Sequence, residues 1–127
     1  MNFLSGKILA ADRLYIAGAE LACLPQLDAL GPDTPVTVCL RPEDVIVRNV
    51  HSHATNTFEV QVGVMEFIGS HFATTLHVLG TNLNVSADFS MNDVRDLGIA
   101  AGKTIRVGLP PERLRVFPQV SMPVQTL

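Results

Sequence analysis

Apolar and polar residues alternate in many short segments of the chain, and glycine, proline or asparagine interrupts them at short intervals. A period of two places successive side chains on opposite faces of a strand. Many such segments, separated by turn residues, are typical of antiparallel barrels and sandwiches. The pattern therefore predicts an all-β fold, with short strands at Phe3–Ala10, Arg13–Ile16, Glu20–Leu24, Val36–Leu40, Val45–Arg48, Thr57–Phe67, Phe72–Val78, Leu83–Ala87, Thr104–Leu109 and Leu114–Phe117.

The connections between these strands carry local signals of their own. LGTN at residues 79–82 supplies a glycine and an asparagine for positive φ angles, which predicts a tight hairpin. One short helix is expected over MNDVRDL, with Ser90 as its N-cap and Gly98 at its end. The proline-rich segment 25–35 is expected to be irregular, and residues 119–127 are expected to be a frayed tail.

Two stretches share one pattern: VCLRPEDVIV at residues 38–47 and VGLPPERLRV at residues 107–116. Val36 to Val47 aligns with Ile105 to Val116 at a constant offset of 69 residues (105 − 36). Each stretch alternates, reaches a Pro-Glu pair and resumes with apolar residues. Because proline cannot donate to a sheet ladder, the chain must leave the sheet there. The duplication predicts a strand, corner, strand unit used twice, in two interlocked OB-like lobes of about five strands each.

Composition bears mainly on partners. The 127 residues carry a net charge of −3, so a basic surface for nucleic acid is not expected. Hydrophobic residues make up 47% and mean hydropathy is +0.30, yet no stretch approaches the length of a membrane span. The apolar excess predicts burial against a partner in a homodimer. Cys23 and Cys39 lack metal-site spacing and are expected to be buried, reduced thiols.

Several segments resemble catalytic or binding motifs only in part. GIAAGKT at residues 98–104 has three residues between its glycines where a phosphate-binding loop needs four, and it follows a helix, so a helix end and a turn are expected. His51 and His53 lack a third metal ligand nearby in sequence, and His71 and His77 are expected to face outward. GSH at residues 69–71 is not a nucleophile elbow.

Charged and aromatic residues add two expectations. The carboxylates at the two corners, Glu43, Asp44 and Glu112, are expected to cap backbone N–H groups or to pair with Arg41 and Arg113. Phe58 and Phe67 fall on opposite faces of one predicted strand, so one of these two rings is expected to be exposed.

Three stretches together, VCLRPEDVIV, VGVMEFIGSHFATTLHVLGTNLNV and LGIAAGKTIRVGLPPERLRVF, resemble the transport-associated OB domain called TOBE in order and spacing. The residues that carry the resemblance are also the candidate interface and corner residues: Arg41, Pro42, Glu43, Asp44, Glu66, Gly69, Ser70, Pro111 and Glu112.

The resemblance implies a C-terminal regulatory and dimerising domain, over residues 1–118, of the ATP-binding subunit of a bacterial ABC importer. Such a domain pairs with its own copy and works with the ATPase domain of the same subunit and a membrane permease. It lies in the cytoplasm, peripheral to the inner membrane. The ATPase motifs belong to another part of such subunits, so this chain is expected neither to hydrolyse ATP nor to hold a cofactor or catalytic residues.

Three other functions stay open from the sequence. One is a free-standing oxyanion-binding module like the related molybdate-binding domains, to which Ser70, Thr74 and Lys103 could contribute. The others are an OB-type nucleic-acid binder, against which the acidic balance counts, and an enzyme of unassigned type. The transported solute is not encoded in this part of such a subunit.

Overall fold

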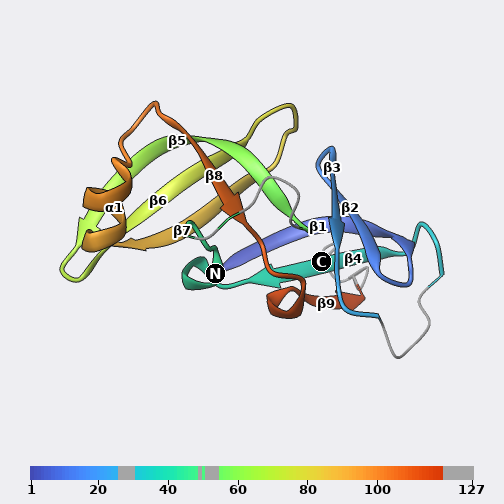
Figure 1. Ribbon diagram of the computed structural model, residues 1–127. Helices are drawn as coiled ribbons and strands as arrows, with labels where there is room; N and C mark the ends of the chain where they lie inside the picture. The colour runs from blue at the N-terminus through green and yellow to red at the C-terminus, as the bar shows by residue number, and fades with distance from the viewer. Residues whose placement is uncertain (26–30, 49, 51–54, 119–127) are drawn as a thin grey trace, which may run out of the picture.

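The computed structural model describes residues 1–25, 31–48, 50 and 55–118. It is all-β with one short helix, as predicted, and its strands form two antiparallel sheets (Figure 1). Sheet A contains β1 (Asn2–Ala10), β2 (Arg13–Ile16), β3 (Ala19–Ala22), β4 (Pro35–Leu40) and β9 (Arg115–Pro118), in the order β3-β2-β1-β4-β9. Sheet B contains β5 (Thr57–Ile68), β6 (His71–Val78), β7 (Asn84–Ser90) and β8 (Thr104–Gly108), in the order β7-β6-β5-β8.

Both sheets are built on one topology. In each, three consecutive strands form a meander, and the first of the three also pairs with the fourth: β1 with β4, and β5 with β8. A fifth segment then joins from the other half of the chain. β9 pairs with β4 in sheet A, and Ile46 makes an isolated bridge to Gly108 at the end of β8.

These two contacts occupy equivalent positions in the two copies of the duplication. The offset of 69 residues turns the Ile46–Gly108 pair into the Arg115–Cys39 pair, and both pairs are antiparallel partners. The Ile46 and Gly108 backbones exchange two hydrogen bonds, at 3.0 and 2.9 Å. Each copy therefore gives its last segment to the sheet of the other copy.

The predicted corners are present as single 3₁₀ turns, η1 (Pro42–Asp44) and η2 (Pro111–Arg113). Each turn has proline at its start, where the missing N–H is not needed. Backbone bonds of 2.9 Å close them, from Asp44 N to Arg41 O and from Arg113 N to Pro110 O.

The predicted strand Val45–Arg48 is wrong, because only Ile46 pairs there. After Ile46 the chain leaves β8, and the Arg48 guanidinium instead donates to Asp93 and Asp96 of the helix α1 (Met91–Leu97). The single bridge at Ile46 depends on glycine at position 108. A Cβ added to Gly108 would lie 2.9 Å from Cγ1 of Ile46, so a larger residue there would require Ile46 to shift.

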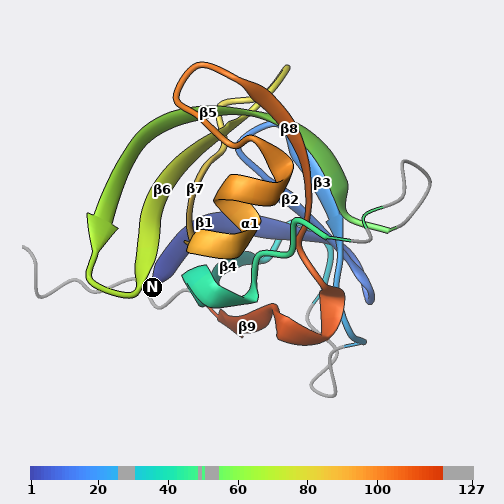
Figure 2. The same ribbon diagram turned by 60° about the vertical axis from the view of Figure 1, so that its left-hand side comes forward.

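The β6–β7 hairpin and the helix follow the sequence, with one correction. Gly80 has φ +78°, but Asn82 has no positive φ; Thr81 instead supports the turn by donating to Val78 O at 2.9 Å and accepting from Leu83 N at 3.0 Å. Ser90 Oγ accepts from Asp93 N at 3.0 Å, and Gly98 ends α1 in the left-handed region. Figure 2 shows α1 at one end of sheet B, between β7 and β8.

The other expected strands exist, with ends displaced by at most three residues. The third strand is Ala19–Ala22, and the one expected at Leu83–Ala87 is Asn84–Ser90. The expectations for His51, His53, the tail 119–127 and residues 26–30 of the proline-rich segment fall outside the described residues.

One hydrophobic core joins the inward faces of the two sheets. Its buried members include matched positions of the duplication, namely Val38 and Val107, Leu40 and Leu109, and Val45 and Leu114. The leucine before each corner and the first residue after each corner are therefore anchored in a shared core.

We expect Leu40→Ala and Leu109→Ala to destabilise the chain by similar amounts, about 2–5 kcal/mol each, because both leucines are 1% exposed at equivalent positions. Urea unfolding monitored by far-UV circular dichroism measures the change. Leu79→Ala, at a leucine that is 42% exposed, is the control and should change stability little. A loss confined to one of the two core variants would contradict the equivalence.

Candidate functional site

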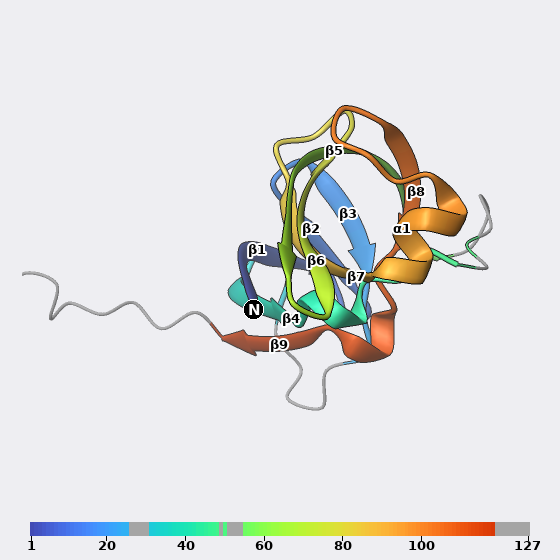
Figure 3. The ribbon, with the colours of Figure 1, turned by 90° about the vertical axis from the view of Figure 1, so that its left-hand side faces the viewer.

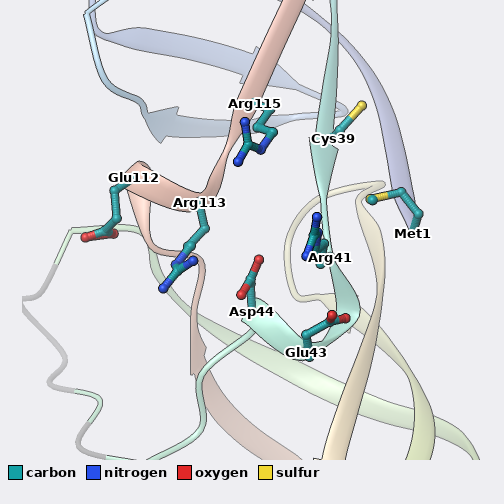
Figure 4. A pocket seen from close by; sticks show the side chains of 8 residues that line it. All are labelled: Met1, Cys39, Arg41, Glu43, Asp44, Glu112, Arg113 and Arg115. Atoms are coloured by element: carbon teal, nitrogen blue, oxygen red, sulfur yellow. The ribbon is translucent and has the colours of Figure 1, made fainter.

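The two corners lie beside each other and enclose a hollow of about 230 Å³ (Figure 4). The exchange of strands creates it, because β9 runs back along β4 and brings η2 to η1. Its lining comes from both copies of the duplication and the N-terminus: Met1, Cys39, Arg41, Glu43, Asp44, Glu112, Arg113 and Arg115.

The hollow is charged but balanced. Three arginines and three carboxylates line it, and no ion pair within 4 Å joins any two of them among the described residues. In Figure 4 the Arg41, Arg115 and Asp44 side chains turn toward the middle, whereas Glu112 points away. Unpaired groups of both signs favour a partner that also carries both signs over a small anion.

The predicted roles of the corner carboxylates are wrong for the residues that the structure describes. Neither corner has a side-chain cap on its turn, and Arg41 and Arg113 form no ion pair with Glu43, Asp44 or Glu112. Backbone hydrogen bonds and proline close the turns unaided, so these charges remain available at the surface.

The candidate residues fall into two separate groups. Arg41, Pro42, Glu43 and Asp44 lie at the first corner, beside Pro111 and Glu112 of the second corner. Glu66, Gly69 and Ser70 lie at the far tip of the β5–β6 hairpin. The tip turn is Gly69–Ser70, with φ +67° at Gly69, while Glu66 still pairs with Ala73 inside the strands.

The hairpin tip is the second notable surface. Val64, Phe67 and Ile68 are exposed there, and the Phe67 and Phe72 rings lie 5.2 Å apart between centroids. Phe58, by contrast, packs against the core, so one ring of the Phe58 and Phe67 pair is exposed, as expected. A bulge between Val62 and Met65 shifts the register and bends β5 at this point.

Ser70, His71 and Asp88 lie in line at this tip. Ser70 Oγ is 3.1 Å from His71 Nδ1, and His71 Nε2 is 3.7 Å from Asp88 Oδ1. The second distance exceeds a hydrogen bond, and the serine sits on an exposed hairpin turn rather than at a strained strand-to-helix elbow. The arrangement fits surface polar contacts. The contacts of His71 and His77 lie at the surface, as expected for side chains that face outward, and His77 Nδ1 lies 2.8 Å from Asn84 Oδ1.

The sequence analysis missed two buried asparagines. Asn2, at the start of β1, donates to Leu40 O at 3.2 Å and to Ser86 O at 2.9 Å, and accepts from Ser86 N at 2.7 Å. Asn56, just before β5, donates to Leu109 O and Ala22 O and accepts from Ala22 N, at 2.9, 2.8 and 2.7 Å.

These two asparagines occupy equivalent places. Leu40 and Leu109 are matched positions of the duplication, and β3 and β7 are the edge strands of sheets A and B. Each amide exchanges two hydrogen bonds with one edge residue, as a paired strand would, and so ties the start of one sheet to the edge of the other. Composition gives no signal for this role, since asparagine in a polar connector is typical of turns.

The remaining candidate chemistry is structural. Residues 98–104 are a helix end and a turn before β8, as expected, with Lys103 N bonded to Ala100 O at 3.1 Å. Neither cysteine is in a disulfide, and Cys39 is half-buried rather than buried. The hydrogen bond to Asp93, and then that to Asp96, raises the pKa of Arg48 above its usual value.

Within the described ranges, no three His, Cys, Asp or Glu side chains come together as a metal site. In the same ranges, no helix has the length and apolarity to cross a bilayer.

Comparisons with known proteins cover most of the chain. A sequence model of the TOBE domain matches residues 38–117. The chain is 34% identical over 93 residues to the Fe(3+) ions import ATP-binding protein FbpC 2 of Rhizobium meliloti (strain 1021); the match covers 65% of this chain and 24% of that protein. The chain thus spans about a quarter of this relative.

A solved structure has the same fold. The crystal structure of the cytoplasmic molybdate-binding protein ModG with molybdate bound superposes with a TM-score of 0.75, over 93% of this chain and 96% of that chain, at 16% identity. This likeness confirms the OB-like fold of the two sheets.

We expect Asn2→Ala and Asn56→Ala each to destabilise the chain by about 2–4 kcal/mol, because each removes an amide that makes three buried or part-buried hydrogen bonds, two to C=O groups and one from an N–H. Urea unfolding checks this. Asn84→Ala, at an exposed asparagine that contacts His77, is the matched control. Equal stability of Asn56→Ala and Asn84→Ala would contradict the role given to Asn56.

Proposed function

Since this chain belongs to the TOBE domain family, we propose that it is the C-terminal regulatory and dimerising domain of the ATP-binding subunit of an ABC-type importer. In that role it supports ATP-driven solute uptake without hydrolysing ATP. It works beside the ATPase domain of the same subunit and a membrane permease, in the cytoplasm and peripheral to the inner membrane. The domain extends over residues 1–118, with 119–127 as its tail.

The observation that carries the proposal is the combination of family and relative. The TOBE match spans both corners, and the 34% identical relative is an ATP-binding protein of iron import, of which this chain corresponds to about a quarter. What a dimerising domain needs is a rigid body with apolar surface to cover. A single core, two asparagine ties and exposed residues such as Phe3 and Phe117 agree with that requirement.

The alternative function is a free-standing oxyanion-binding module, which the structural likeness to the molybdate-binding protein ModG suggests. Its candidate residues do not support it. Thr74 is buried and bonds Phe72 O at 3.3 Å, Ser70 lies at the hairpin tip, and Lys103 lies in the turn before β8. These three residues belong to different parts of sheet B, and no hydrogen bond joins any two of them within the described chain.

The purified chain should release no phosphate from Mg·ATP, because the proposal places ATP hydrolysis in another domain. Phosphate release is measured against a buffer blank. In parallel, isothermal titration with molybdate should give no heat beyond dilution. Turnover of ATP that persists through a second purification step would contradict the proposal. Saturable molybdate binding would favour the alternative function.

The chain should sediment as a dimer at equilibrium, because the proposal has two copies paired. The expected result is a mass twice that of the 13.7 kDa chain, with dissociation on dilution. A monomer mass at the highest soluble concentration would contradict the dimerising part of the proposal.

A further inference from the structure

The outer face of sheet A carries several exposed apolar side chains. Successive residues of β1 alternate between core and solvent, and Phe3 points outward with 69% of its surface exposed. Phe117 on β9 is 51% exposed, and Tyr15 on β2 is also exposed. Figure 3 shows β1, β4 and β9 running side by side on one side of the molecule.

Small side chains lie between the two phenylalanines. On β4, the central strand of these three, Thr37 pairs with Phe117 and Cys39 pairs with Phe3. Thr37 and Cys39 are half-buried. The face therefore presents two large rings on either side of a row of small residues. The rings of one sheet can pack against the small residues of a second, identical sheet.

The charged hollow is continuous with this face. Cys39 and Arg115 form one cross-strand pair of sheet A and also line the hollow, together with Met1. Three arginines and three carboxylates there are without ion pairs among the described residues. A surface with equal numbers of both signs is complementary to itself, because a two-fold axis can bring the arginines of one copy to the carboxylates of the other.

We infer that two copies of this chain pair through the outer face of sheet A, with Phe3 and Phe117 at its centre and the charged hollow at its rim. This inference rests on the proposed function and names the surface that carries it. The tip of the β5–β6 hairpin, with Val64 and Phe67, is the competing surface, and the His71 and Asp88 side chains beside it already lie 3.7 Å apart.

Sedimentation equilibrium of the full chain and four variants tests the inference. Phe3→Glu and Phe117→Glu place a charge at the centre of the proposed interface, whereas Val64→Glu and Phe67→Glu place the same charge on the competing tip. We expect each of the first two to weaken the dimer at least about 30-fold, as a lost hot-spot residue does, and the other two to leave it unchanged. All four sites are exposed, and urea unfolding should confirm that every variant folds.

The outcomes separate the inference from the proposed function. A monomeric wild type overturns the dimerising role and this interface together. A wild-type dimer that persists in Phe3→Glu and Phe117→Glu overturns the interface alone, and dissociation by Val64→Glu or Phe67→Glu would assign it to the hairpin tip. Dissociation by the sheet A variants only supports the inference.

Alkylation of Cys39 by N-ethylmaleimide, followed by mass spectrometry, provides a second readout that needs no variant. Cys39 lies between the two rings and is half-buried, while Cys23 is buried in the core. The rate per molecule at Cys39 should rise several-fold when the wild-type chain is diluted below its dissociation constant. A rate independent of dilution across a confirmed dimer-to-monomer transition would overturn the inference.

Discussion

The reciprocal exchange of strands at the two proline corners is the constraint on which the structure depends. Because proline removes a ladder donor and η1 and η2 turn the backbone sharply, neither β4 nor β8 continues within its own sheet. Each copy must complete the other, through the Cys39–Arg115 and Ile46–Gly108 pairs. The shared core and the hollow between the corners both follow from this crossing.

The two buried asparagines, Asn2 and Asn56, provide hydrogen bonds between the two crossed sheets. The edge strands β3 of sheet A and β7 of sheet B each have backbone groups that face the other sheet and need hydrogen-bond partners. Asn2 and Asn56 meet this need with a side-chain amide, which has the same donor and acceptor as a peptide group. With both ties made, rigidity comes from hydrogen bonds as well as from packing, as suits a domain proposed to hold a pair of subunits together.

Sequence reasoning predicted most of the fold because the relevant signals are local. Alternation, Gly80, Ser90, Gly98 and the repeated Pro-Glu pair each constrain the residues beside them. It failed where distant residues decide. Beyond Ile46 the segment Val45–Arg48 leaves the sheet, and Arg48 instead contacts Asp93 and Asp96, 45 and 48 residues away along the chain. Similarly, Asn56, whose amide bonds Leu109 O 53 residues away, has the same local pattern as any asparagine in a turn.

The candidate site shows the same division. The corner residues were identifiable because the sequence repeats them, and the charges at Arg41, Glu43 and Glu112 lie together because the two copies cross. That these charges are unpaired follows from side-chain geometry, which no spacing rule encodes. Grouping Glu66, Gly69 and Ser70 with the corners followed the family pattern, but in space they belong to a different surface.

The pairing of β4 with β9 also bears on how the chain is made. Cys39 and Arg115 are 76 residues apart (115 − 39), so β4 leaves the ribosome long before the strand that will cover its outer edge. Until β9 has been synthesised that edge is open to mispairing, and a contact of such long range forms slowly. Sheet A is thus completed only after all of sheet B has been synthesised, and a nascent chain halted before β9 presents an open strand edge at β4.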